Sequence, residues 1–322
     1  MVLYNLADTY FVGMLNDPVQ NAAVTLAAPM LLAFNAVTNL FGVGSSSMMS
    51  RALGRKDYEM VKRSAAFGFY CTLFCGILFS LGYTILKQPA LAVLGATELT
   101  EEATAGYLMW TVSCGTVPAM LNVVMAYMVR SEGEALHASI GTMSGCLLNM
   151  ILDPIFILPW GLDMGAAGAG CATFLSNCAA CMYFFVLLIV KRKRTFVCIN
   201  PKMFSFKKQI VLGVCGVGIP SSIQNVLNVT GMTILNNFTA VYGADAVAAM
   251  GITQKVNMVP LYVAMGMSQG IMPLISYTYA SGNYKRMKGG LKFALKVSLG
   301  FITTAAVLYF VGAGTITRMF MD

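Results

Sequence analysis

Residues 165–194 read GAAGAGCATFLSNCAACMYFFVLLIVKRKR, an uncharged apolar run that ends in four consecutive basic residues. At about 1.5 Å per residue, a helix over residues 165–190 is longer than the roughly 30 Å of hydrocarbon in a bilayer. Lysine and arginine are costly inside that layer and accumulate on its cytoplasmic side. The stretch therefore predicts a membrane-crossing helix whose C-terminal end faces the cytoplasm.

The composition of the whole chain agrees with this prediction. Of its 322 residues, 57% are hydrophobic and 11% are charged, and the mean hydropathy is +0.72. Soluble domains carry roughly 25% charged residues, so the composition excludes an ordinary soluble protein. The formal net charge of +8 sits in short basic patches between apolar runs. We expect membrane lipids as partners of these patches and no nucleic acid.

Apolar runs bounded by charges, glycines and prolines predict an all-α polytopic membrane protein with nine helical spans. We expect them at residues 1–15, 22–48, 64–86, 101–129, 137–160, 164–190, 208–240, 246–280 and 289–317. The first run is too short to cross the membrane. We therefore expect the start of that helix to be missing from this chain.

The charges of the loops predict the orientation. Eighteen of the 21 lysines and arginines lie in or beside the loops after spans two, four, six and eight. The alternate loops carry mainly acidic residues, with Lys87 as the basic exception. Because basic residues accumulate on the cytoplasmic side, we expect a multi-pass protein of the cell (inner) membrane with a cytoplasmic N-terminus.

An internal repeat predicts two lobes. It pairs Gly42, Gly54, Tyr58, Lys62 and Phe67 with Gly270, Gly282, Tyr284, Lys288 and Phe293, at offsets of about 226 to 228 residues. Two spans separated by six keep one orientation, so the repeat is parallel and predicts a bundle of six plus six helices. We expect an N-terminal lobe at 1–190, a cytoplasmic linker at 191–207 and a partial C-terminal lobe at 208–322, with about nine of twelve spans present.

Two aspartates inside apolar runs, Asp8 and Asp153, are candidates for function. A central charge costs on the order of 2.5–3.5 kcal/mol in a membrane helix, so it marks a functional site unless the acid is a protonated structural group. Each lies about six residues from the outer end of its span, roughly 9 Å deep. Asn149 shares the face of Asp153, Tyr4 shares that of Asp8, and Thr173 enters the next span to a similar depth. These oxygen atoms suit a proton or a hard monovalent cation such as Na⁺, and composition does not choose between them.

Other polar residues inside spans predict a substrate cavity. Asn35 and Asn39 lie on the second span, Gln224 and Asn228 on the seventh, and Lys255 on the eighth. They are candidates for lining an aqueous cavity between the lobes. The amides are equally compatible with hydrogen bonds between helices, and the Lys255 stem is long enough to reach the outer interface.

Motifs for enzyme chemistry are missing from the sequence. It contains no HExxH, no GxSxG and no P-loop, and the aspartates lack the GxGD setting of an intramembrane aspartyl protease. We therefore expect neither an enzyme nor an ATP-driven pump, and no cofactor beyond a coupling ion.

Four segments carry a family resemblance: Leu3–Gly13 (LYNLADTYFVG), Gly42–Gly54, Asn149–Pro154 (NMILDP) and Gly165–Thr173. In this order and spacing the chain resembles the multidrug and toxic compound extrusion (MATE) family, truncated at both ends. The resemblance implies a twelve-helix, two-lobed antiporter that exports organic, often cationic compounds in exchange for protons or sodium ions. It implies that Asp8, Asn149, Asp153 and Thr173 form the coupling-ion site. We expect small organic substrates, alternating access and a monomer.

Two other functions stay open. A lipid-linked precursor flippase of the same superfamily would need basic residues in the cavity to meet pyrophosphate, and we expect no arginine inside a span. A non-transporting, truncated membrane protein would fit the incomplete length.

Overall fold

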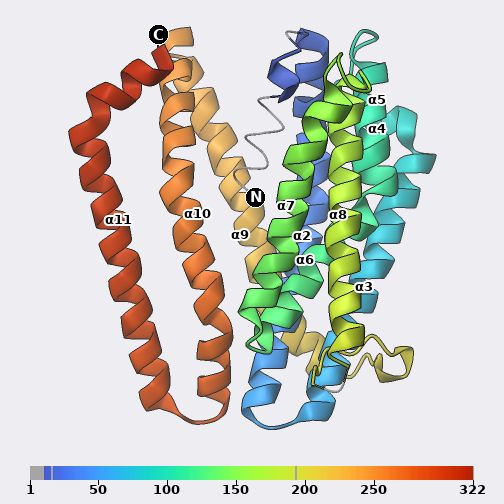
Figure 1. Cartoon of the computed structure of the whole chain (residues 1–322), viewed down its shortest axis with the longest axis vertical. Coiled ribbons are helices and arrows are strands. Elements are labelled where there is room, and N and C mark those ends of the chain that lie inside the picture. The colour runs from blue at the N-terminus through green and yellow to red at the C-terminus, as the bar shows by residue number, and fades with distance from the viewer. Residues whose placement is uncertain (1–10, 16, 193, 322) are drawn as a thin grey trace.

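The computed structural model describes residues 11–15, 17–192 and 194–321, which fold into a bundle of long helices (Figure 1). No strand occurs in these ranges. The long helices are α2 (Pro18–Gly54), α3 (Tyr58–Ile85), α6 (Thr116–Ser131), α7 (Ala135–Ile157), α8 (Gly165–Val190), α9 (Lys208–Ala240), α10 (Ala244–Ala280) and α11 (Tyr284–Met321). The short elements are α4 (Lys87–Val93), α5 (Glu101–Leu108), the π-helical turn η1 (Met109–Cys114) and the 3₁₀ turn η2 (Pro201–Met203).

The membrane spans follow the prediction closely. Within the described residues, seven helices are long and apolar enough to cross a bilayer, and the bent pair Glu101–Cys114 and Thr116–Ser131, counted as one span, brings the number to eight. The predicted first span, 1–15, lies largely outside the described residues. The predicted boundaries 22–48 are wrong, because α2 extends from Pro18 to Gly54. The Asp17 carboxylate caps its start by accepting a hydrogen bond from the Val19 amide at 2.9 Å.

The span predicted as one helix over 101–129 is broken. Its two halves meet at an angle of 50° after the π-helical turn. Gly115 stands at the bend, where a Cβ atom would lie 2.7 Å from the Thr111 carbonyl oxygen. A side chain at this position would therefore force the bend open.

The helices form two groups. Figure 1 shows α2 to α8 as one bundle, the first lobe, with α9 to α11 beside it as the second lobe. The lobes meet where α9 crosses α2 and where the end of α10 approaches the end of α2. The loops after α2, α8 and α10, which carry the basic residues, all lie at one end of the molecule (Figure 1).

Glycines allow the two lobes to touch backbone to backbone. A Cβ atom on Gly218 of α9 would clash with the carbonyl oxygen of Leu40 on α2, and one on Gly44 would clash with that of Val214. Association inside lipid depends on such close packing, because lipid tails are as apolar as the helix surfaces. Helices α2 and α9 therefore contact each other through backbone atoms at these glycines.

The predicted repeat is present in the turn geometry. Lys56 and Gly282 both adopt a left-handed backbone, with φ of 60° and 75°. In each loop the next residue, Asp57 or Asn283, accepts through its side chain from the backbone amide three residues later, at 3.0 and 3.1 Å. The predicted pairing of Gly54 with Gly282 is wrong by two residues. Gly282 is equivalent to Lys56, and the constant offset is 226.

A pair of glycines on α9 tests the lobe contact. We expect Gly218→Ala to destabilise the protein by roughly 1–3 kcal/mol, because the added methyl overpacks the crossing with α2. The matched change Gly216→Ala adds the same group where no atom lies within 4 Å. It should be neutral or stabilising by up to about 1 kcal/mol, since alanine is the better helix former. Thermal unfolding in detergent checks both, and equal effects would contradict the close contact.

Candidate functional site

One face of α7 carries polar side chains that are buried inside the first lobe. Every fourth residue along it is buried: Gly141, Gly145, Asn149, Asp153 and Ile157. The glycines bring α8 close, and a Cβ atom on Gly145 would lie 3.1 Å from the Ala180 Cβ atom. The same spacing that packs α7 against α8 therefore directs an amide and a carboxyl group away from lipid.

Asn149 and Asp153 form a pair shut off from solvent. The Asn149 Nδ2 atom donates to the Asp153 Oδ1 atom at 3.0 Å, and both side chains have zero exposure. The Asn149 Oδ1 atom is buried and has no hydrogen-bond partner within the described part of the chain. An unmatched buried acceptor beside a carboxyl group is a costly arrangement that a proton donor or a cation would relieve.

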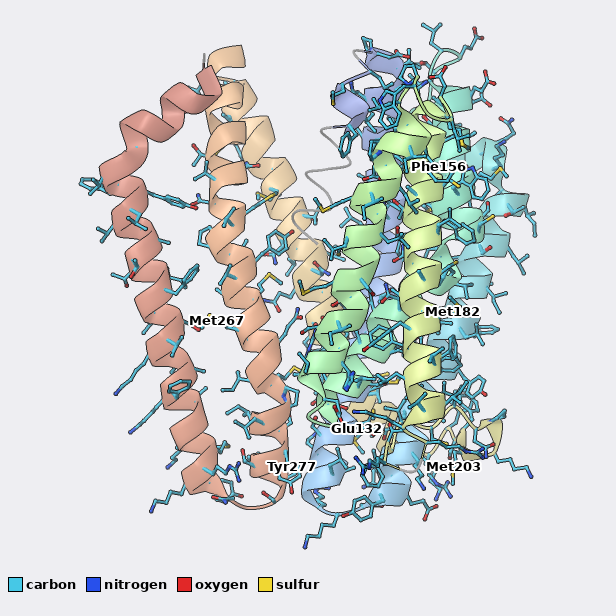
Figure 2. All side chains as sticks on the ribbon, viewed as in Figure 1. Glu132, Phe156, Met182, Met203, Met267 and Tyr277 are labelled. Atoms are coloured by element: carbon cyan, nitrogen blue, oxygen red, sulfur yellow. The ribbon has the colours of Figure 1, made fainter. Side chains whose placement is uncertain are left out.

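A short loop closes the end of the lobe next to this pair. The Leu162 amide donates to the Ile155 carbonyl at 2.8 Å, and the Met164 amide to that of Phe156 at 3.0 Å. Gln20 on α2 accepts from the Ala166 amide at 2.8 Å and so caps the start of α8. Phe156 lies toward the end of the molecule opposite the basic loops (Figure 2). The pair therefore sits in the half of the lobe predicted to be the outer one.

Thr173 lies on α8 at the level of this pair. Helices α7 and α8 run antiparallel, and a Cβ atom on Gly168 would clash with the carbonyl oxygen of Phe156. Five residues further along α8, Thr173 is half-buried and falls at the height of the segment between Asn149 and Asp153. The structure thus places three of the predicted ion-site residues in one layer. Tyr4 and Asp8, which were predicted to join them, lie outside the described residues.

A second pair of hydrogen-bonded polar side chains, Asn122 and Asn177, was not predicted and extends this layer. The Asn122 Nδ2 atom of α6 donates to the Asn177 Oδ1 atom of α8 at 3.1 Å. The Asn122 Oδ1 atom is buried with no hydrogen-bond partner among the residues described. Asn177 follows Thr173 by four residues and shares its face. This four-residue spacing from Thr173 is the sequence feature that could have identified Asn177 as part of the layer.

The predicted cavity residues are partly brought together. Helices α2 and α9 are antiparallel, and the Ser222 hydroxyl donates to the Ala36 carbonyl at 2.7 Å. This contact sets half-buried Asn35 of α2 and exposed Gln224 of α9 at neighbouring heights. The Asn35 amide nitrogen donates to a carbonyl of its own helix at 2.9 Å.

Two more predicted cavity residues continue these faces. Asn39 follows on α2, where its amide nitrogen donates to the Asn35 carbonyl at 3.1 Å. Asn228 continues the face of Gln224 on α9 and is exposed. Lys255 belongs to α10, but its side chain lies outside the described residues. The amide nitrogens of Asn35 and Asn39 thus bond within their own helix.

Two arginines at the basic-loop end bridge the lobes, as their place beside the predicted loops allows. Arg51 and Arg130 stand in the last turns of α2 and α6. The Arg51 guanidinium donates to the Gly213 carbonyl of α9 at 2.9 Å. Arg130 donates to Gln269 of α10 at 3.4 Å and lies 5.7 Å from the centre of the Tyr127 ring. The two arginine side chains therefore link the lobes at the end of the molecule that carries the basic loops.

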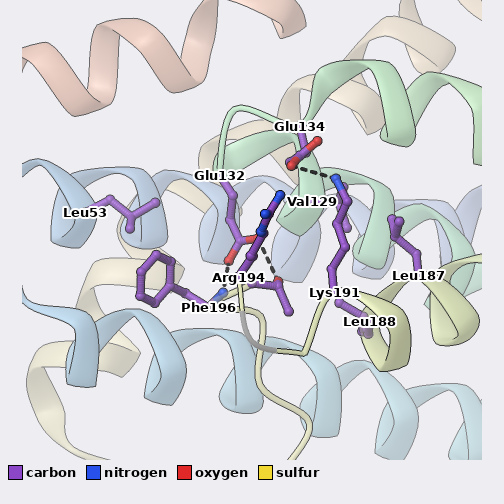
Figure 3. A pocket seen from close by; sticks show the side chains of 10 residues that line it. Leu53, Val129, Glu132, Glu134, Leu187, Leu188, Lys191, Arg194 and Phe196 are labelled. Atoms are coloured by element: carbon purple, nitrogen blue, oxygen red, sulfur yellow. Dashed lines mark hydrogen bonds and ion pairs between the residues drawn. The ribbon is translucent and has the colours of Figure 1, made fainter.

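The linker after α8 is fastened to the first lobe around a cavity of about 110 Å³ (Figure 3). The Glu132 carboxylate accepts from the Thr195 hydroxyl at 2.7 Å and from the Phe196 amide at 2.6 Å. Lys191 donates to Glu134 at 2.7 Å. Burial raises the pKa of Glu132, whereas the hydrogen bond from Lys191 lowers the pKa of Glu134.

Comparison with known proteins identifies relatives along most of the chain. The MatE family matches residues 1–155 and 220–322. The multidrug export protein MepA of Staphylococcus aureus (strain MRSA252) is 32% identical over 309 residues, which are 95% of this chain and 66% of that protein. MepA of Staphylococcus saprophyticus is 30% identical over 311 residues, 96% of this chain and 67% of that protein. The chain thus spans about two thirds of the length of these relatives.

Solved structures show the same fold. An outward-facing conformation of a multidrug resistance MATE family transporter of the MOP superfamily is 27% identical, with a TM-score of 0.92 over 99% of this chain and 70% of that one. A MOP superfamily transporter from Pyrococcus furiosus, described as having a binding pocket of reverse polarity, matches with a TM-score of 0.89 over the same shares at 27% identity.

The buried Glu132 predicts a pH dependence. Because its pKa is raised above the ordinary value of 4.5, the folded state favours the protonated form. The stability it contributes is full below pH 4.5 and is lost as the pH rises through the raised pKa. In Glu132→Gln the amide oxygen still accepts from Phe196 without titrating, so the unfolding temperature should fall less with rising pH. Thermal unfolding across this range checks it, with the exposed Glu98→Gln as the control. Identical pH profiles in wild type and Glu132→Gln would contradict the assignment.

Proposed function

The chain belongs to the MatE family, and from this premise we propose that it acts in the ion-coupled export of small organic compounds across the cell membrane. Its relatives are named multidrug export proteins. The observation that carries the coupling part of the proposal is the Asn149–Asp153 pair, fully buried inside a membrane lobe. Intramembrane carboxyl groups at such positions mark ion and proton pathways.

The coupling ion binds at Asp153 in this proposal. Either a proton on the carboxyl group or a sodium ion among oxygen ligands removes the cost of burying its charge. The Asn149 Oδ1 atom supplies a buried acceptor that has no hydrogen-bond partner among the described residues, and Thr173 supplies a hydroxyl from the same layer. Asp8 and Tyr4 complete the site in the proposal. We propose no metal beyond this monovalent cation, and no other cofactor.

Export then proceeds by alternating access between the lobes. The contacts between α2 and α9 and the two arginines gather at the basic-loop end. This arrangement supports a state that is closed to the cytoplasm, and the similar structure of high TM-score is described as outward-facing. Ion binding at the outer half of the first lobe would shift the lobe toward a form that releases substrate, so ion and substrate exclude each other.

Export of a lipid-linked precursor is the second candidate function. Arg51 and Arg130 give the contact between the lobes a positive charge that such a substrate would require. Both side chains, however, are engaged by groups of the second lobe. The binding pocket of reverse polarity in a similar transporter is described as suggesting a different function for that protein, and one fold can host several functions. Export of small organic compounds remains the proposal that the sequence relatives, which are named multidrug export proteins, support.

Replacing the buried acid tests the coupling. Asp153→Asn removes the titratable group while keeping its shape, so ion-driven efflux should fall at least tenfold, to the level of protein-free vesicles. Asp163→Asn makes the same change on the exposed loop of the same hairpin and should leave efflux unchanged. Fluorescent-dye efflux is measured in vesicles reconstituted with the protein, under a pH gradient and a sodium gradient applied separately.

The separate gradients identify the ion. The driving gradient should lose its effect in Asp153→Asn, while a gradient of the other ion has no effect in either protein. Full efflux by Asp153→Asn, with normal unfolding temperature, would reject the coupling role. Asp8→Asn should repeat the loss if both acids serve one site.

A further inference from the structure

A row of lysines runs along the first turns of α11. Lys285, Lys288, Lys292 and Lys296 follow one another at intervals of three and four residues, which keeps them on one helical face. The row extends over roughly 16 Å at about 1.5 Å per residue. All four side chains are exposed.

This lysine row lies opposite the face of α11 that packs on α10. That face is marked by Gly290, where a Cβ atom would lie 3.3 Å from the Leu274 side chain, and by Tyr309, whose hydroxyl donates to the Val256 carbonyl at 3.1 Å. Gly290 is two residues from both Lys288 and Lys292, so their side chains point roughly 160° away from it. Figure 2 shows nitrogen-tipped side chains on the lower part of α11, on the side away from α10.

The positive charge of the row is not compensated by the helix itself. Residues 284–321 include no aspartate or glutamate. The ion pairs found in the described part of the chain all involve the first lobe: Arg63 with Glu59, and Glu134 with His137 and Lys191. An anionic partner is therefore the chemistry that this face fits.

The row also lies at the right height for lipid headgroups. Helix α11 has 38 residues, about 57 Å, whereas the hydrocarbon layer is roughly 30 Å thick. Its start lies at the end of the molecule that carries the basic loops (Figure 1). After Lys296 the next charged residue is Arg318, so the row occupies the turns just before the apolar part of the helix, where lysine stems reach the interface.

The repeat shows that this face is a docking surface in the first lobe. With the offset of 226, Lys288, Lys292 and Lys296 correspond to Lys62, Ala66 and Tyr70 of α3. There the linker covers the face. The Tyr70 hydroxyl donates to the Ile199 carbonyl at 2.6 Å, and the Phe204 ring lies 5.7 Å from that of Tyr70. In the second lobe, Lys292 and Lys296 replace Ala66 and Tyr70 of this face, whereas the position of Lys288 holds a lysine in both lobes.

We propose that the lysine row of α11 binds the headgroups of anionic phospholipids in the cytoplasmic leaflet. Polybasic segments beside membrane helices attract such lipids, and the attraction falls with salt. The row would bind the phosphate groups of several neighbouring lipids along the second lobe. This binding is independent of the coupling ion and of the exported compound.

The test compares two triple variants in reconstituted phosphatidylcholine vesicles. One is Lys288→Gln, Lys292→Gln and Lys296→Gln; the control is Lys56→Gln, Lys202→Gln and Lys208→Gln, three exposed lysines of the same membrane side. Electron paramagnetic resonance of spin-labelled lipids measures the association of phosphatidylglycerol relative to phosphatidylcholine. We expect the first triple variant to lose most of its preference for phosphatidylglycerol. Each lysine removed should lower the relative association by at most roughly fivefold, and the control variant should lose little.

Further outcomes decide against the proposal. Equal losses in both triple variants would mean a diffuse effect of net charge and would overturn it. So would a failure of Lys288→Arg, Lys292→Arg and Lys296→Arg to keep the preference, because arginine retains the charge. The four lysines should also react with amine reagents in lipid-free detergent. If they are protected there, another part of the protein covers the face, and the proposal fails.

Discussion

Hydrocarbon cannot hydrogen-bond a backbone, and this constraint determines how the molecule is assembled. Every backbone group in the membrane must be satisfied within helices, and lipid supplies no hydrophobic force to bring helices together. Close approach of bare backbone does so instead. Gly44 and Gly218 bring α9 against α2, Gly54 brings the end of α2 against that of α10, and Gly145 and Gly168 bring α8 against α7. The glycine positions therefore decide which polar side chains come to share a layer.

The same constraint makes polar side chains inside the lobe expensive. Asn149 donates a hydrogen bond to Asp153, and the acceptor oxygen of Asn149 has no hydrogen-bond partner among the residues that the structure describes. The Asn122–Asn177 pair repeats this pattern in the same layer, where the Asn122 Oδ1 atom also has no hydrogen-bond partner in the described part of the chain. Purely structural amides would be expected to use their acceptors, because an unsatisfied buried group costs about 1–3 kcal/mol. Two such oxygen atoms in one layer support a cationic occupant of the lobe.

Most of the spans and the pairing of Asn149 with Asp153 followed from local periodicity. Asn149 and Asp153 are four residues apart on an apolar helix, so their shared face could be predicted, and the charges of the loops marked the ends of the spans. The bend at Gly115 could not, because a π-helical turn has no strong local signature. The roles of Arg51 and Arg130 also escaped prediction. Their partners, Gly213 and Gln269, are more than 130 residues away along the chain, so no local pattern connects them.

The anchored linker limits where the lobes can move. Glu132 holds Thr195 and Phe196, Tyr70 holds the Ile199 carbonyl, and the Phe204 ring stacks on Phe67 with 6.1 Å between centres. Residues 195–204 are thereby part of the first lobe, while α9 begins at Lys208 and belongs to the second. Any rocking of the lobes must be absorbed by residues 205–207, where the Phe206 ring still contacts the Phe67 ring edge to face at 5.8 Å between centres, and by sliding at the glycine contact of α2 with α9. A hinge this short favours rotation about the basic-loop end over separation of the lobes, because three residues span at most about 11 Å.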